Sequence, residues 1–564
     1  MANIMYVDNI RVEFDQEATV LDVCRKAGVE VPNFCFHSDL SVYGACRMCM
    51  VENLDTGEIS AACTTKPKNG LRIRTNSARL LKYRRMILEL MLSAHCRDCT
   101  ACEKNRSCRL QEMAVRFGIH HVHFQDTREH IPQDQSSPAV QMDYNKCILC
   151  GDCVRVCKEV QGMGILHFAG RGPGLRIEAG DDQQLASTHC VSCGQCAAVC
   201  TTGAITVKNQ IGQAWRALHD PKMRVVIQIA PAVRVALGEA YGIPSGENVL
   251  DQLVTALKIM GADEVYDTIF GADLTVREES QEFLRRLETG ENLPLMTSCC
   301  PAWVRYVENE RPQFLKNLSS ALSPMQMLAT VLKDRYREKD ARDGRTTYHI
   351  AIMPCTAKKM EAGRPEFRRD GVPNVDLVLT TQEVIRMMKE SGIRFQMLEK
   401  EAPDLPFGMG SGAAEIFGAS GGVAEAVARY CLKDKSKNAL RMLEHSGLRG
   451  SDPVRFVTLP IGEREVHIAI VHGLSNAAKL LDQIENGEVQ VDLVEVMSCR
   501  TGCVGGAGQP YALMNTKLQR AHGLYEIDRS AMFKRSERNP VINAMYDAGL
   551  EARAHELLHQ EYEE

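Results

Sequence analysis

The stretches CILCGDCVRVC, residues 147–157, and CVSCGQCAAVC, residues 190–200, decide how the middle of this chain folds. Both have the spacing C-x2-C-x2-C-x3-C, and their first cysteines lie 43 positions apart. A duplication this closely matched predicts two equivalent metal sites within one small domain. We place that domain at residues 127–209.

Iron–sulfur clusters explain the repeat better than two zinc knuckles, because this spacing holds two [4Fe–4S] clusters in bacterial two-cluster ferredoxins. In those proteins the fourth cysteine of each run binds the other cluster. The predicted ligand sets are Cys147, Cys150, Cys153 and Cys200 for one cluster, and Cys190, Cys193, Cys196 and Cys157 for the other. Lys158 and Thr201 replace the proline that usually follows the fourth cysteine, which changes the turn and keeps the ligands.

Two more cysteine groups precede the repeat. The first, spaced C-x10-C-x2-C-x13-C, consists of Cys35, Cys46, Cys49 and Cys63. Four thiolates at this spacing can hold a [2Fe–2S] cluster, with zinc as the alternative. The second, spaced H-x3-C-x2-C-x5-C, consists of His95, Cys99, Cys102 and Cys108. It suits a [4Fe–4S] cluster with one imidazole ligand, and a zinc site is again the alternative.

The segments around these groups predict distinct domains. Residues 1–78 alternate strand-like runs with a helix candidate at 18–28, which indicates a small β-rich domain, whereas 79–126 have helical periodicity. From residue 210 to residue 564, strand-like runs such as MRVVIQIA, YHIAIM and VDLVLT alternate with helical segments. This alternation is typical of an α/β domain.

Composition narrows the functional class. The 564 residues are 45% hydrophobic and 25% charged, with a net charge of −5, so no basic surplus favours nucleic acid as a partner. The amino terminus lacks the apolar run of a signal peptide, and no stretch is apolar enough to span a bilayer, so we expect a cytoplasmic protein. Because thiols are kept reduced there, 23 cysteines indicate metal rather than disulfides.

Three further cysteine loops lie in the large domain: TSCCPAW (297–303), MPCTAKK (353–359) and EVMSCRTGCVGGAGQP (495–510). They resemble the three signatures of the [FeFe]-hydrogenase catalytic domain. The front end resembles that of complex I large subunits and of long hydrogenases, so the resemblance covers essentially the whole chain. Only Cys24, Cys96 and Cys431 remain outside the spaced groups.

The resemblance implies a specific cofactor, the H-cluster, in which a [4Fe–4S] cube is joined to a di-iron subsite that carries carbon monoxide, cyanide and azadithiolate. The implied cube ligands are Cys300, Cys355, Cys499 and Cys503, with the Cys503 sulfur bridging to the subsite. Lys358 is the implied partner of a cyanide. Cys299 is the implied proton donor, since a thiol has a reference pKa of about 8.5, not far from neutrality.

The resemblance also implies a proton relay and an apolar pocket. Glu279 and Glu282 lie three residues apart and would share a helix face, which without the resemblance would indicate solvated surface. Ser319 matches the intervening hydroxyl of the relay. The implied pocket residues are Ala230, Pro231, Pro324, Met353, Phe417 and Met497.

Some positions depart from the family pattern. Arg500 and Thr501 replace a common Pro-Gly pair, Ser498 a common alanine, Ala507 a glycine, and Met325 a polar residue. All ligands are retained, so these changes bear on cluster potential and catalytic bias.

Two other motifs suggest different functions, a zinc peptidase and a nucleotide-binding protein. HELLH, residues 555–559, satisfies the zinc metallopeptidase pattern, but only five residues follow it. The glycine-rich stretch FGMGSGAAEIFGASGG has the wrong spacing for a nucleotide fingerprint, so any NAD(P) or flavin should be carried by a partner subunit.

We therefore predict a multidomain α+β and α/β protein with four domains: a β-grasp [2Fe–2S] domain (1–78), a one-histidine, three-cysteine segment (79–126), a two-cluster ferredoxin domain (127–209) and an iron hydrogenase domain (210–564). Its expected reaction is the interconversion of H2 with protons and electrons. One [2Fe–2S] and three [4Fe–4S] clusters would relay electrons to or from ferredoxin or NAD(P)-linked, flavin-binding partner subunits. Hydrogenase maturation proteins would build the di-iron subsite. A hydrogen-sensing or electron-relay protein with little turnover is the alternative, although sensing relatives tend to lose Cys299.

Overall fold

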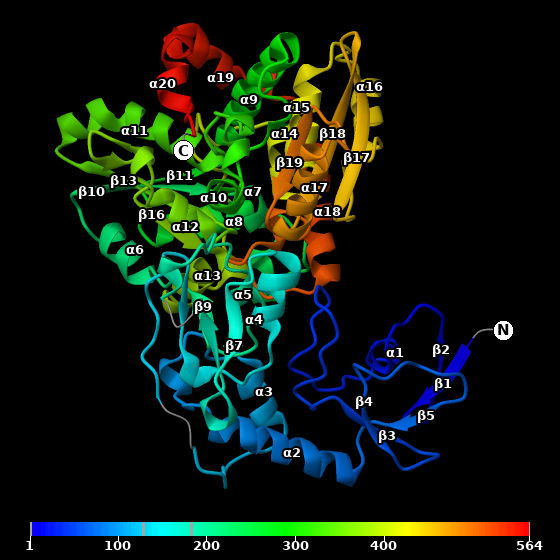
Figure 1. Ribbon diagram of the computed structural model, residues 1–564. Helices are drawn as coiled ribbons and strands as arrows, with labels where there is room; N and C mark the ends of the chain where they lie inside the picture. Colours follow the sequence, from blue (N-terminus) through cyan, green and yellow to red (C-terminus); the bar gives the residue numbers. More distant parts are fainter. Residues whose placement is uncertain (1–2, 127–129, 181–183, 563–564) are drawn as a thin grey trace. The chain divides into compact units, whose positions relative to one another are not determined.

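The computed structural model describes residues 3–126, 130–180 and 184–562. Internal contacts divide the chain into two compact units (Figure 1). Unit 1 comprises Met1–Thr188 with Val199–Thr206, and unit 2 comprises His189–Ala198 with Val207–Glu564. The second cysteine run, which the sequence assigns to one ferredoxin domain, is thus shared between the units.

Unit 1 begins with a mixed five-stranded sheet of order β2-β1-β5-β3-β4. Asp8 and Asn9 have positive φ and join β1 to β2, as a tight hairpin requires. Helix α1 (Val20–Lys26) begins at Thr19, whose hydroxyl and Asp22 form a reciprocal capping box. The predicted β-rich domain and its helix are therefore confirmed. The strands are β1 Asn3–Val7, β2 Ile10–Phe14, β3 Met50–Asn53, β4 Ile59–Ala61 and β5 Arg72–Arg74.

The predicted helical segment of unit 1 is also present, as α2 (Ala78–Ser93) and α3 (Arg109–Arg116). The buried Arg84 of α2 donates to the carbonyl oxygens of Met48, Thr75 and Met50 at 3.2, 2.8 and 2.7 Å, which fastens this helix to the cysteine loop and the sheet. Short strands and helices follow: β6 Val140–Met142, α4 Asp152–Arg155, β7 Leu166–Ala169, β8 Arg176–Ala179, α5 Gln195–Val199 and β9 Ile205–Val207.

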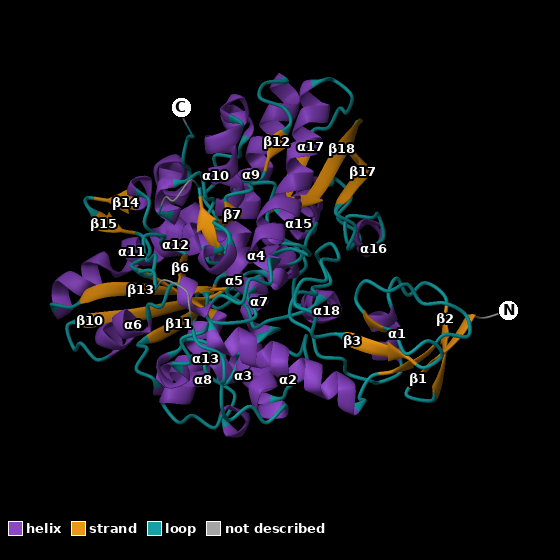
Figure 2. Ribbon diagram, turned by 60° about the horizontal axis from the view of Figure 1, so that its bottom comes forward, coloured by secondary structure: helices purple, strands orange, loops and turns teal. Residues whose placement is uncertain are grey.

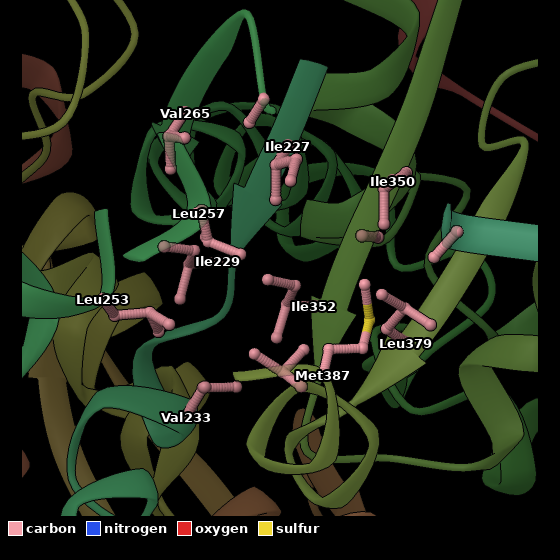
Figure 3. Packing of buried hydrophobic residues seen from close by; sticks show 14 of the residues in the cluster. Ile227, Ile229, Val233, Leu253, Leu257, Val265, Ile350, Ile352, Leu379 and Met387 are labelled. Atoms are coloured by element: carbon pink, nitrogen blue, oxygen red, sulfur yellow. The ribbon is translucent and has the colours of Figure 1, made fainter. Parts of the chain in front are cut away.

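Unit 2 contains a parallel four-stranded sheet of order β11-β10-β13-β16. Strand β10 (Met223–Ile229) is buried along almost its whole length, because helices cover both of its faces. Ile227 and Ile229 pack with residues of α8 (Leu250–Ile259) and α13 (Thr381–Glu390), which Figures 2 and 3 show. Val226 belongs to another cluster, with residues of α11 (Pro324–Asp343). The other strands are β11 Glu264–Asp267, β13 Thr346–Met353 and β16 Leu377–Thr380, so the predicted α/β alternation is confirmed.

A second sheet in unit 2 has the order β12-β19-β18-β17, in which β12, β19 and β18 are parallel and β17 is antiparallel. β19 is fully buried, whereas β17 alternates exposed and buried residues, as an edge strand with one solvated face does. The strands are β12 Leu295–Met296, β17 Val454–Ile461, β18 Arg464–His472 and β19 Leu493–Met497.

Long helices surround both sheets of unit 2. In α9 (Ile269–Thr289), Gly271 allows close packing on α11, since a Cβ atom at this position would lie 2.1 Å from the Pro324 carbonyl oxygen. Among the described residues, no helix is long and apolar enough to cross a membrane. The remaining longer or site-bearing helices are α6 Ile211–Leu218, α7 Pro231–Arg234, α10 Pro301–Glu310, α12 Ala357–Ala362, α14 Gly412–Glu415, α15 Gly422–Cys431, α16 Lys437–Glu444, α17 Leu474–Glu485, α18 Met514–Ser530, α19 Pro540–Met545 and α20 Ala554–Leu558.

A buried ion triad fixes the short helix α7, which follows β10. Arg234 donates to Asp267 at 2.5 Å and to Glu415 at 3.0 Å, and its side chain is 1% exposed. Replacing the cation by Met would leave two buried carboxylates without a counter-charge. We expect Arg234→Met to lower the free energy of unfolding by about 3–5 kcal/mol, measured by chemical denaturation.

Arg529→Met is the matched control for this substitution. Arg529 and Glu526 are 62% and 48% exposed, so the loss of their ion pair should cost less than about 1 kcal/mol. Equal effects of the two substitutions would show that the triad does not anchor α7.

Candidate active site

Four loops that carry candidate residues each follow the carboxyl end of a parallel strand in unit 2. β10 leads into Ala230, β12 into the loop 297–300, β13 into Cys355 and β19 into Cys499. Ligand sites of α/β proteins form at this end of the strands, because the loops there converge. Two sheets therefore contribute to one site.

The loops line one apolar cavity. Every predicted pocket residue lines it: Ala230, Pro231, Pro324, Met353, Phe417 and Met497. The walls also contain Met325, one of the departures from the family pattern, and the cysteines of all three loops: Cys299, Cys300, Cys355, Cys499 and Cys503.

The chemistry of this cavity favours a cationic metal cluster. Burial, together with the neighbouring cysteines, raises the pKa of the Cys499 thiol to about 11 and moves the pKa of Cys355 well above its ordinary value. Four thiolates can share this space only if concentrated positive charge is placed among them. Gly502 has φ +89°, and a Cβ atom there would lie 2.6 Å from the Ser420 amide nitrogen, so the loop between two cysteines must carry glycine.

Lys358 supplies a single buried cation at the cavity wall. Its Nζ donates to the Cys299 carbonyl oxygen at 3.2 Å and pairs with Glu361 at 2.7 Å. Despite its burial, the lysine pKa is raised, because Glu361 and the nearby cysteines favour the charged form. The side chain is thus held as a charged donor beside the cavity.

The predicted relay residues form a row behind the cavity. Ser319 donates to Glu282 at 3.3 Å, and Glu279 is fully buried. Burial raises the pKa of Glu279 to about 8, with Glu282 adding to the shift and the Ser319 hydroxyl opposing it. Burial and the Glu279 charge raise the pKa of Cys299, so the neutral thiol borders a carboxyl group that is protonated near neutral pH.

Sequence reasoning missed one contact to the cysteines that the family resemblance implies as cube ligands. Gln195, inside the second ferredoxin-like run, donates to the Cys499 sulfur at 3.2 Å and to the Gly505 carbonyl oxygen at 3.3 Å. The same run packs on the MPCTAKK loop, since the Thr356 hydroxyl donates to the Ser192 carbonyl oxygen at 3.0 Å. No local pattern marks a glutamine between two cysteines as a donor to a third, more than 300 residues away.

Unit 1 brings together three of the predicted ligand sets. The first set, Cys35, Cys46, Cys49 and Cys63, is buried, and the Cys49 and Cys63 sulfurs are 3.3 Å apart. The first ferredoxin set lines one small cavity: Cys147, Cys150, Cys153 and Cys200. This is the grouping expected when the fourth cysteine of the second run crosses over.

The one-histidine group lies against that ferredoxin site. The Arg97 amide donates to His95 Nδ1 at 3.1 Å, which makes Nε2 the candidate ligand atom. A Cβ atom at Gly203 would lie 2.6 Å from the Cys102 sulfur, so this loop approaches the group through a glycine. The Cys108 sulfur lies 4.0 Å from the Thr201 carbonyl oxygen, in the loop that follows Cys200.

The second ferredoxin set is divided, with Cys157 in unit 1 and Cys190, Cys193 and Cys196 in unit 2, and its grouping stays a prediction. Across the described ranges, no three His, Cys, Asp or Glu side chains converge as ligands of a single metal ion. All 23 cysteines are free of disulfides. The HELLH string does not form one helix, because α20 ends at Leu558. Both ring nitrogens of His559 are hydrogen-bonded, one to Ser320 and the other to Glu278.

Family comparison accounts for this arrangement. Residues 223–507 match the family described as the iron-only hydrogenase large subunit, C-terminal domain. The chain is 37% identical, over 99% of its length and 98% of the relative, to the NADP-reducing hydrogenase subunit HndD of Solidesulfovibrio fructosivorans. The chain belongs to the iron-only hydrogenase family. Iron hydrogenase 1 of Clostridium pasteurianum is 33% identical over 99% of both chains.

Other parts of this iron-only hydrogenase match separate families. Residues 4–78 match a 2Fe–2S cluster binding domain, 84–123 the NADH-ubiquinone oxidoreductase-G iron–sulfur binding region, and 137–206 a ferredoxin-like domain of NADH-quinone oxidoreductase subunit 3. Residues 514–564 match the iron hydrogenase small subunit, which the sequence did not separate from the large domain.

Solved structures support the same assignment. A variant of the [FeFe]-hydrogenase HydA1 from Chlamydomonas reinhardtii is 34% identical, with a TM-score of 0.53 over 63% of this chain and 98% of that one. The protein is therefore a hydrogenase with several iron–sulfur domains, an oxidoreductase that acts on H2.

Proposed function

We propose that this hydrogenase interconverts H2 with protons and electrons at an H-cluster whose cube is held by Cys300, Cys355, Cys499 and Cys503. The observation that carries this proposal is the convergence of these cysteines, from loops on two sheets, around one apolar cavity. When bound, the cluster supplies an open iron coordination position at which the H–H bond is cleaved or formed. Cys503, which lines the same cavity, would hold the di-iron part of this cofactor, with its carbon monoxide, cyanide and azadithiolate ligands.

Other residues around this cavity would orient the bound cofactor and supply protons to it. Lys358, a buried ammonium group, would donate a hydrogen bond to an anionic cyanide ligand of the bound cofactor, and the apolar walls would exclude water around it. Protons reach the cavity through Cys299, Glu279, Ser319 and Glu282. Burial keeps both the thiol and the Glu279 carboxyl protonated near neutral pH, so each can donate and then be recharged.

Electrons pass through one [2Fe–2S] and three [4Fe–4S] clusters bound by the four front-end ligand sets. The proximity of the one-histidine group to the first ferredoxin site, and of Gln195 to Cys499, supports such a relay. The likeness to an NADP-reducing hydrogenase subunit favours an NAD(P)-linked partner subunit, with ferredoxin as a second electron carrier. Dedicated maturation proteins build the subsite, because no side chain here supplies carbonyl or cyanide. We place the protein in the cytoplasm, where thiols are kept reduced and available to bind clusters.

An infrared spectrum of anaerobically purified protein tests the proposal. After co-expression with hydrogenase maturases, we expect iron-bound carbonyl and cyanide bands that shift under H2. The matched control is protein expressed without maturases, which should contain the cysteine-ligated clusters but neither the bands nor activity. Full iron–sulfur clusters without these bands in the co-expressed protein would instead indicate an electron-relay protein.

A further inference from the structure

A histidine of the carboxy-terminal tail lies at the surface end of the proposed proton relay. After α20, the chain turns into an extended segment whose residue His559 forms a β-bridge with Ala321. The Gln560 amide donates to the Ser320 carbonyl oxygen at 2.7 Å, and the Leu322 amide donates to the Leu558 carbonyl oxygen at 2.9 Å. The tail is therefore fixed by main-chain hydrogen bonds directly beside Ser319.

Side chains continue the row from Glu282 to this tail. Ser320 Oγ lies 3.0 Å from Glu282 Oε2 and 2.8 Å from His559 Nδ1. On the other side of the ring, His559 Nε2 lies 2.9 Å from Glu278 Oε2. One hydroxyl thus joins a relay carboxylate to an imidazole, and a second carboxylate fixes the ring.

Hydrogen-bond counting shows that this row carries one mobile proton. Ser320 has a single O–H, so it cannot donate to Glu282 and to His559 at the same time. While Glu278 is ionised and accepts a hydrogen bond from His559 Nε2–H, both contacts become hydrogen bonds in two states. In one, His559 is an imidazolium that donates to Ser320 Oγ while Ser320 donates to the Glu282 carboxylate. In the other, protonated Glu282 donates to Ser320 while Ser320 donates to neutral His559 Nδ1.

The other groups on Glu282 cannot pass a proton onward to solvent. Arg286 donates to Glu282 Oε1 at 2.5 Å, but a guanidinium group stays protonated in proteins. Ser319 leads inward toward Glu279. Imidazole, in contrast, is the side-chain group that ordinarily changes charge near neutral pH.

The histidine also has access to water. His559 is 12% exposed, compared with 6% for Glu282, and both line one surface cleft with Ser320. Charged and polar groups of three segments face the same cleft: Glu278, Arg285, Arg286, Lys316, His555, Glu561 and Tyr562. Water in this cleft can therefore reach the imidazole ring.

We propose that His559 exchanges protons between the cleft water and Glu282 through the Ser320 hydroxyl. This inference rests on the proposed function, because it extends the relay that begins at Cys299. For H2 formation, a proton from the cleft water reaches His559 Nε2 on the side of Glu278, the Nδ1 proton moves to Ser320 Oγ, and the Ser320 proton moves to Glu282 Oε2. For H2 oxidation the same transfers run in reverse, so protons are conserved and no electron moves.

Two substitutions separate proton exchange from structure. His559→Gln retains polar groups at the end of the side chain but cannot titrate, and Ser320→Ala removes the bridging hydroxyl. We expect each to lower H2 formation about tenfold, below the ~10²–10⁴-fold range of a positioned acid or base, because Glu282 itself remains. Their double variant should lose no more than either single variant, since both break one row. Imidazole added to the buffer should restore most of the activity of His559→Gln. Without imidazole, this variant should have a larger solvent deuterium isotope effect on H2 formation than the wild type.

The matched control is His522→Gln, an exposed histidine of α18 that pairs with Glu526 outside the cleft. It should retain wild-type turnover. Unchanged activity of His559→Gln, or a loss that imidazole does not restore, would overturn the role of His559. Infrared bands and iron content measured on the same preparations show whether the H-cluster assignment has failed instead. Wild-type activity in Glu279→Gln would show that the inner relay has failed.

Discussion

Cys299→Ser should lower H2 turnover by roughly 10²–10⁴-fold while iron content and the infrared bands remain those of the wild type, because a positioned proton donor contributes that much. The substitution keeps the size and shape of the side chain in the cavity but replaces a thiol by a hydroxyl, which is a far weaker acid. H2 formation with a reduced dye, together with iron quantification, measures the effect.

Cys431→Ser is the appropriate control. It replaces a thiol by a hydroxyl at another buried position of unit 2, in α15, which lies outside the predicted ligand sets. Its turnover should stay within about twofold of the wild type, as expected of a side chain without an acid–base role. A fully active Cys299→Ser variant would remove this thiol from the mechanism. A variant that loses iron would instead indicate a structural role beside Cys300.

Glu279→Gln is expected to have an effect of similar size, roughly 10²–10⁴-fold, because an amide cannot exchange the proton that the carboxyl group holds. The exposed Glu288 lies on the same helix, so Glu288→Gln controls for the loss of one carboxylate from α9. Activity of Glu279→Gln near that of the wild type would mean that protons reach Cys299 by another route.

The free energy of unfolding should depend on pH because of the Glu279 carboxyl group. The pKa of Glu279 is about 8 in the folded protein and ordinarily 4.5, so between these values the unfolded chain releases a proton that the folded chain keeps. The wild type therefore loses stability relative to Glu279→Gln as pH rises from about 4.5 to about 8, and the difference becomes constant above that range. Thermal unfolding at several pH values tests this, and a constant difference across the range would contradict the raised pKa.

The sequence predicted local features well, because cysteine spacing and strand and helix periodicity depend on neighbouring residues. Strand β10 follows from MRVVIQI alone, and the apolar cavity contains each pocket residue that the family resemblance implied. Long-range polar contacts were not predictable in this way. Gln195 and Ser320 lie in motifs with other expected roles, and His559 belongs to a string that suggested zinc. Their partners are determined only by tertiary packing.

The origin of the cube cysteines has a consequence for folding. Cys300, Cys499 and Cys503 follow strands of one sheet, whereas Cys355 follows a strand of the other. A cluster bound to all four would cross-link two halves that are otherwise joined by side-chain packing and by hydrogen bonds, such as that of the Gly508 amide to the Pro354 carbonyl oxygen at 2.9 Å. Cluster binding and closure of unit 2 are therefore thermodynamically linked, so each must strengthen the other by the same free energy. Partial opening of either half would remove at least one ligand from the cube. An intact cube would therefore be bound only when both halves are packed together.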